Sequence, residues 1–170
     1  MIRAALVCLA LAGPVWADCG GYERTFLTCQ ITDSTKVLSV CFDDEVASYR
    51  FGPKAGAPEL EITQPIASLT YTPWPGAGST IWEEVQFFNA GHTYMVVAAI
   101  ERQIPDDPDA VIGEGHFGGV LVHRGAKEVA DLTCDPESIY INYMSGLSEA
   151  KNRLGYVWNQ TDQAWVALPD

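Results

Sequence analysis

TIWEEVQFFNAGHTYMVVAAIERQ, residues 80–103, is the stretch that decides the fold. Its two halves, residues 80–89 and 93–103, are rich in the β-branched and aromatic residues that favour strands. Between them the segment Asn89-Ala90-Gly91-His92 carries a glycine, as tight turns usually do. The stretch therefore predicts an antiparallel β-hairpin.

Similar short runs, separated by turn residues, continue on both sides of this hairpin. We expect strands over residues 23–31, 36–42, 46–52, 59–63, 67–71, 117–123 and 127–134. No helical segment lies between them, which excludes parallel βαβ units. The predicted fold class is all-β, an antiparallel meander of eight or nine strands that forms a barrel or a sandwich.

The last part of the chain has a different pattern. Residues 145–154 have helical spacing of apolar residues, with Ser145 as a cap and Gly155 at the end. Residues 156–158 and 164–166 predict a small terminal hairpin. We expect a β-domain over residues 18–134 and, over residues 135–170, a helix and hairpin packed on it, attached through Trp158 and Trp165.

The first seventeen residues have the pattern of a secretory signal peptide. Arg3 supplies the positive charge, residues 4–12 are apolar, and Val15-Trp16-Ala17 ends in a small residue. We expect cleavage after Ala17 and export to the periplasm, an oxidising compartment. The remaining chain has no segment of membrane-spanning length, so no membrane insertion is expected.

Four cysteines follow the expected cleavage site, and they allow three pairings. A hairpin centred near residue 35 would place Cys29 opposite Cys41, within disulfide range. An extended strand after Cys19 would keep it away from Cys29. We therefore expect the bridges Cys29–Cys41 and Cys19–Cys134, unless residues 19–25 form a compact turn.

The chain is strongly acidic, with 22 Asp and Glu against 10 Lys and Arg and a formal net charge of −12. Such a charge repels nucleic acid and attracts cationic partners. The simpler interpretation is solubility alone. The expected partner is a cationic protein or a small ligand.

Catalytic patterns are weak in this sequence. The three histidines, His92, His116 and His123, stand apart in the sequence, and no G-x-S-x-G motif is present. Paired cysteines would leave no free thiolate. We therefore expect a protein that is not an enzyme. A hydrolase with two carboxylates stays an alternative because carboxylate spacing is a property of the fold.

Acidic residues between 106 and 116 could together coordinate a cation. They are Asp106, Asp107, Asp109 and Glu114, with His116 beside them. Their spacing does not match a calcium loop. We interpret them as a solvated acidic loop and expect no metal and no cofactor.

The candidate binding segment is residues 71–82, YTPWPGAGSTIW. Its prolines and glycines force a loop, and a tryptophan on an exposed loop is a typical contact in protein interfaces. The candidate binding residues are Tyr71, Trp74, Ser79 and Trp82. Alternatively, Trp74 folds over an open end of the β-domain as a plug.

Several short motifs resemble a group of small exported proteins of Proteobacteria. They are Phe26-x-x-Cys29, Leu38-Ser39-Val40-Cys41, Tyr49-Arg50-Phe51-Gly52 and Pro58-Glu59-Leu60. More distantly, the expected architecture, export and acidic charge are similar to those of periplasmic inhibitors of C-type lysozyme. That resemblance implies a disulfide-bearing β-barrel that presents a loop to an enzyme.

The sequence thus predicts an exported binding protein without catalytic activity. An inhibitor of a basic hydrolase that attacks the cell envelope is the sharpest form of this hypothesis. The alternatives are a carrier that holds a small ligand in the barrel interior and a hydrolase of envelope polymers.

Overall fold

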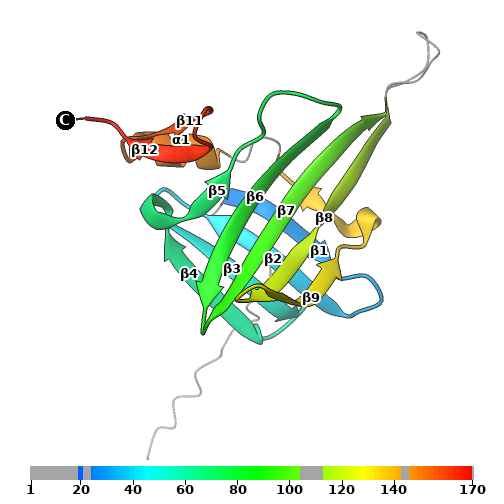
Figure 1. Ribbon diagram of the computed structural model, residues 1–170. Coiled ribbons are helices and arrows are strands. Elements are labelled where there is room, and N and C mark those ends of the chain that lie inside the picture. The colour runs from blue at the N-terminus through cyan, green and yellow to red at the C-terminus, as the bar shows by residue number, and fades with distance from the viewer. Residues whose placement is uncertain (1–18, 21–23, 104–112, 143–145, 170) are drawn as a thin grey trace, which may run out of the picture.

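A computed structural model describes residues 19–20, 24–103, 113–142 and 146–169 of the chain (Figure 1). The expected signal peptide, the Ser145 cap and Asp106, Asp107 and Asp109 lie outside these residues, as does the side chain of Glu114. The described part is mostly antiparallel β-structure with one short α-helix, α1. The all-β class expected from the sequence is therefore confirmed.

Five strands form the first sheet, in the spatial order β10-β1-β2-β3-β4. All four neighbouring pairs are antiparallel. The strands that follow one another in the chain are joined by short turns, as the hairpin pattern predicts. Their bounds are β1 Arg24–Gln30, β2 Lys36–Phe42, β3 Val46–Pro53, β4 Leu60–Pro65 and β10 Tyr140–Ile141.

Five further strands form the second sheet, in the order β5-β6-β7-β8-β9. The hairpin expected over residues 80–103 is confirmed as β6–β7, with Asn89 paired to His92 at its turn. Figure 1 views the molecule with this sheet in front of the first one. The bounds are β5 Thr70–Thr72, β6 Thr80–Asn89, β7 His92–Gln103, β8 Gly113–Arg124 and β9 Lys127–Thr133.

The tail begins with a short turn and a strand that the sequence did not predict. The 3-10 turn η2 (Pro136–Ser138) leads into β10, which joins the edge of β1. The expected helix and terminal hairpin are present as α1 (Leu147–Arg153), β11 (Tyr156–Asn159) and β12 (Ala164–Ala167). They lie beside β5 (Figure 1).

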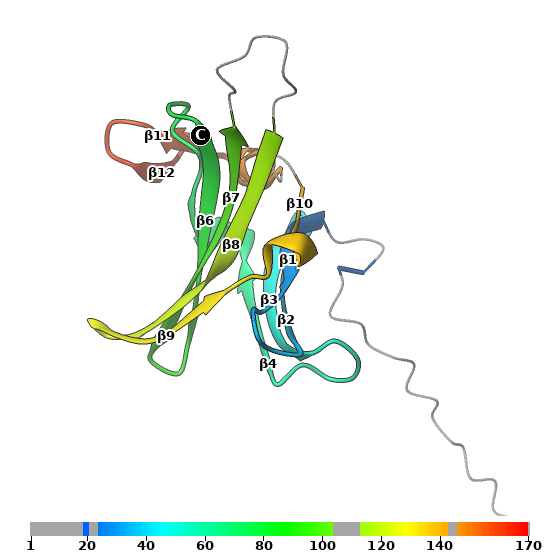
Figure 2. The same cartoon turned by 90° about the vertical axis from the view of Figure 1, so that its right-hand side faces the viewer.

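One hydrophobic core lies between the two sheets, which Figure 2 shows as two layers. Alternate residues of each strand face it, as the two-residue period of β-structure requires. Its largest fully buried side chains include Tyr49, Phe26, Phe42 and Phe87. The tail contributes Leu147 and other residues, so the helix is part of the same core.

The two sheets are linked at both ends but do not close into one sheet within the described residues. On one side Ile31 forms an isolated antiparallel bridge with Cys134. On the other side the 3-10 turn η1 (Ile66–Ser68) connects β4 to β5. This turn replaces the first half of the strand expected over residues 67–71.

The disulfides join Cys19 to Cys41 and Cys29 to Cys134, with Cα separations of 5.5 and 5.7 Å. The pairing expected from the sequence, Cys29–Cys41 and Cys19–Cys134, is therefore wrong. The four cysteines in the described part of the chain are all paired, and the same four residues were expected to pair.

The register of the first hairpin explains the error. The turn is closed by the hydrogen bond from Ile31 N to Lys36 O, so its centre lies before residue 35. Cys29 consequently faces Leu38, three residues short of Cys41. A shift of three residues moves two side chains beyond disulfide range, because each residue of a strand advances about 3.3 Å.

Cys134 reaches Cys29 because the end of β9 runs beside the end of β1. The backbone of Asp135 donates to Gln30 O at 2.8 Å, next to the bridge between Ile31 and Cys134. The disulfide therefore fastens the last strand of the second sheet to the first strand of the first sheet.

No helix in the described part of the chain is long and apolar enough to span a bilayer.

Candidate functional site

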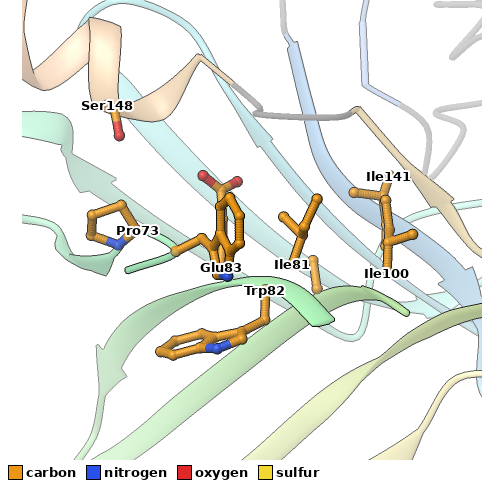
Figure 3. A pocket seen from close by; sticks show the side chains of 9 residues that line it. Pro73, Ile81, Trp82, Glu83, Ile100, Ile141 and Ser148 are labelled. Carbon is orange, nitrogen blue, oxygen red and sulfur yellow. The ribbon is translucent and has the colours of Figure 1, made fainter. Parts of the chain in front are cut away.

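A pocket of about 180 Å³ opens between the beginning of β6, the second half of β7, the loop before β6, and the tail (Figure 3). Its lining is mainly apolar. The residues that line it are Pro73, Trp74, Ile81, Trp82, Glu83, Ala98, Ile100, Ile141 and Ser148. Glu83 is the single charged residue among them, and Ser148 supplies a hydroxyl.

The side chains of β6 alternate between the pocket and the opposite face of the sheet. Figure 3 shows Ile81 and Glu83 directed into the pocket, while the indole of Trp82 lies on the other side of the strand. The inward set continues with the buried residues Val85 and Phe87. Glu83 is thus a carboxylate at a position that the strand pattern assigns to the interior.

A hydrogen-bonded chain ends at this carboxylate. The hydroxyl of Tyr71 donates a short hydrogen bond to Glu83 Oε1, and it lies 3.1 Å from Ser148 Oγ. Because the Tyr71 proton points to Glu83, Ser148 is the donor to Tyr71. Burial, followed by the negative charge of Glu83, raises the pKa of Tyr71 above its usual range, so the phenol stays protonated.

Trp74 forms the wall of the pocket on the loop side. Its indole Nε1 donates to Ala77 O at 3.1 Å, which holds the proline-flanked turn in one shape. The side chain is half-buried. The tail contacts the same loop, since Gln160 Nε2 donates to Pro75 O at 3.4 Å.

Trp165 and Lys151 join the tail to the rest of the protein, Lys151 through a hydrogen bond from its Nζ to Ala67 O at 3.5 Å. Trp165 Nε1 donates to Tyr71 O at 2.7 Å, and the two rings stack with centroids 5.8 Å apart. Lys151 is only 2% exposed, and its Nζ lies over the rings of Trp165 and Tyr156 at 5.3 and 5.5 Å. Desolvation lowers the pKa of Lys151 to about 8.

Of the four candidate binding residues, Trp74 lines this pocket, and Tyr71 adjoins it through its hydrogen bond to the lining residue Glu83. Trp82 borders the pocket from its backbone side and directs its indole away. Ser79 is exposed on the loop and does not line the pocket. The expectation that Trp165 attaches the tail is confirmed, and Trp158 packs on it at 5.5 Å.

Sequence reasoning missed Glu83, Ser148 and Ile141. For Glu83 a signal existed, because a charged residue interrupts the inward series Ile81, Val85 and Phe87. Ser148 and Ile141 belong to the tail, and only the folded chain brings them to β6.

Within the described residues, no three or more His, Cys, Asp or Glu side chains gather in a way that could hold a metal ion. His116 and His123 lie on β8 and His92 begins β7, without a metal-binding neighbourhood there.

Comparison with protein-family models, curated proteins and solved structures found no match. The chemistry of the pocket therefore rests on its own residues. They combine a carboxylate, an indole wall and an apolar lining, and such groups together can contact both a charged group and an apolar stem.

Proposed function

We propose that this chain is an exported, non-enzymatic binding protein whose pocket receives a cationic side chain of a protein partner. The observation that carries the proposal is the carboxylate of Glu83 directed into an apolar pocket that Trp74 also lines. An ammonium or guanidinium group would pair with the carboxylate, while its alkyl stem would contact the indole.

The size of the pocket favours a single side chain as its occupant. Ligand sites for drug-sized molecules measure about 300–1,000 Å³, and this pocket measures about 180 Å³. A carrier for a large ligand would also need space between the sheets. That space holds the core side chains, among them Tyr49 and Phe87, which are at most 1% exposed.

The net charge of −12 supports a cationic partner, because a strongly acidic surface accelerates association with basic proteins. The sharpest form of the proposal is an inhibitor of a basic hydrolase that attacks the bacterial envelope. In this form the chain acts in the periplasm after removal of residues 1–17. The two disulfides are compatible with that compartment.

The proposal includes a barrel-like scaffold for the site. The bridge between Ile31 and Cys134 and the connection through η1 would make the two sheets behave as one curved wall. The proposal does not include glycoside hydrolysis at this pocket, since that reaction uses two facing carboxylic acids and Glu83 is the one carboxylic acid among the described residues that line it.

Calorimetric titration of residues 18–170 against a panel of basic proteins, with a C-type lysozyme among them, tests the proposal. We expect micromolar or tighter binding that weakens as salt rises, since the attraction is electrostatic. Glu83→Gln and Trp74→Ala should each weaken it tenfold or more.

Glu137→Gln is the matched control, because it removes the same charge from an exposed position on η2. It should change the affinity less than twofold. The proposal is wrong if no basic protein binds, or if Glu83→Gln and Glu137→Gln have the same effect. Binding of free alkylamines or arginine alone, without any protein partner, would identify a small-ligand carrier instead.

A further inference from the structure

The outer face of the second sheet has an unusual composition. Because Val85 and Phe87 face the core, the outward series of β6 is Trp82, Glu84, Gln86 and Phe88. Figure 3 shows the beginning of this alternation, with Trp82 on the opposite side of the strand from Glu83. Figures 1 and 2 show no described element drawn across this face.

Cross-strand partners share a face of the sheet, so the register extends the outward set to β7 and β8. Trp82 pairs with Ala99, which pairs with Phe117. In a second row across the same three strands, Gln86 pairs with Met95, which pairs with Leu121. Between these rows lies Val97, which pairs with Glu84.

An antiparallel sheet that faces water normally carries polar residues on that side. Here the middle of the outer face is apolar, with Phe117 50% exposed, and Phe88 near the turn end of β6 is 48% exposed. An apolar patch of this kind on a folded protein marks an interaction surface.

The charges around the patch have one sign. The register extends the outer face to β9 as well. Outward positions of β6, β7 and β9 carry four carboxylates, those of Glu84, Glu101, Glu128 and Asp131. None of them forms an ion pair with a described residue. The basic residues in the described part of these strands, Arg102, Arg124 and Lys127, occupy the alternate positions of the register.

We propose that this outer face, defined by Trp82, Met95, Val97, Phe117 and Leu121 with its four carboxylates, binds a segment of another protein in which apolar residues alternate with Lys or Arg. Apolar side chains of the partner would cover the patch, and its cations would pair with the surrounding carboxylates. A second copy of this chain fits poorly, since it would bring the same four carboxylates against them.

This surface is separate from the pocket, because the indole of Trp82 and the carboxylate of Glu83 lie on opposite sides of β6. The proposal therefore goes beyond the pocket function, and each of the two proposals can be correct when the other is wrong.

The test uses residues 18–170 and three synthetic twelve-residue peptides with alternating Lys and Leu, Glu and Leu, or Lys and Ser. Backbone NMR shifts of the labelled protein follow each titration. We expect the Lys-Leu peptide to shift residues of β6, β7 and β8 around Trp82 and Phe117, and the other two peptides to bind at least fivefold more weakly.

Phe117→Thr and Asp131→Lys should each weaken binding of the Lys-Leu peptide at least fivefold. Tyr140→Ser is the matched control, because Tyr140 is 60% exposed on β10 of the other sheet. This control should stay within twofold of the unchanged protein.

Three results would overturn the proposal. They are equal binding of the Glu-Leu peptide, equal loss in Tyr140→Ser, and shifts confined to other elements. Concentration-dependent dimerisation of the protein that Phe117→Thr abolishes would overturn it as well, since the face would then bind a second copy.

Discussion

The indole Nε1 of Trp165 donates a 2.7 Å hydrogen bond to the backbone carbonyl of Tyr71, across 94 residues of sequence. The same Tyr71 donates its hydroxyl proton to Glu83 in the pocket. Tyr71 therefore takes part both in docking the tail and in positioning the carboxylate of the pocket. The wall that Ser148 adds to the pocket depends on the tail remaining in place.

Trp165→Phe should cost about 1 kcal/mol of unfolding free energy, because it removes the indole donor and keeps the ring stacked on Tyr71. Trp165→Ala should cost about 3 kcal/mol, since the ring contacts are also lost. Urea unfolding measures both, and hydrogen exchange should show faster exchange over residues 146–169 in the alanine variant.

Val166→Ala is the control for that pair, because the neighbouring side chain on β12 is 39% exposed. Its cost should stay below about 0.5 kcal/mol. Equal costs for Trp165→Ala and Val166→Ala would mean that the tail does not dock through the indole.

The two disulfides should differ in their contribution to stability. Cys29–Cys134 closes a loop with a sequence separation of 105, and Cys19–Cys41 one of 22. On the chain-entropy model the long loop is worth about 4–5 kcal/mol and the short loop about 3 kcal/mol. Replacing Cys29 and Cys134 by Ala together should therefore lower stability more than replacing Cys19 and Cys41 in urea unfolding.

Peptide mapping without reduction checks the pairing itself. We expect one linked fragment that contains Cys19 with Cys41 and another that contains Cys29 with Cys134. A fragment that links Cys29 to Cys41 would contradict the register of the first hairpin.

The strands could be predicted from the sequence because each one has a local signal. Runs such as residues 36–42 and 80–89 combine β-branched and aromatic residues, and turn residues bound them. The helix and the terminal hairpin also have local patterns. By contrast, β10 has two residues, Tyr140 and Ile141, which is too short for a pattern to stand out.

Register could not be predicted in the same way. In the first hairpin it depends on a turn in which Asp33 adopts a left-handed backbone with φ of 55°, and on a bulge between Thr25 and Leu27. Neither feature follows from strand propensity. The disulfide pairing failed for this reason, although the cysteines themselves were correctly expected to pair.

The pocket was predictable only in part. Tyr71 and Trp74 have local signals, a strand end and a proline-flanked loop. Ser148 and Ile141 reach the pocket because the tail packs on the second sheet and β10 joins the first. Such contacts between distant segments leave no pattern within either segment.

Gly119→Ala should destabilise the protein, because glycine is required where β8 passes β9. A Cβ at this position would lie 2.5 Å from the backbone oxygen of Leu132, and a backbone atom cannot move aside cheaply. We expect a loss of about 2 kcal/mol or more in urea unfolding. Thr133→Ala, at the cross-strand partner of Gly119, should cost far less. Equal losses would mean that the two strands separate easily.

Lys151→Met should stabilise the protein at pH 6, since the charged ammonium of Lys151 is buried without a carboxylate partner among the described residues. The pKa of Lys151 is lowered from 10.5 to about 8, so between these values the unfolded chain binds more protons than the folded one. The stability of the unchanged protein, relative to Lys151→Met, must therefore rise with pH in that window.

Between pH 6 and 9.5 the advantage of Lys151→Met should shrink by about 2 kcal/mol, as the amine loses its proton in the folded state. Urea unfolding of both proteins at several pH values measures this difference, and groups common to both cancel. Lys36→Met is the control, because Lys36 is partly exposed and pairs with Glu59. A difference between the proteins that is constant with pH would show that Lys151 keeps an ordinary pKa, and hence that its ammonium reaches water.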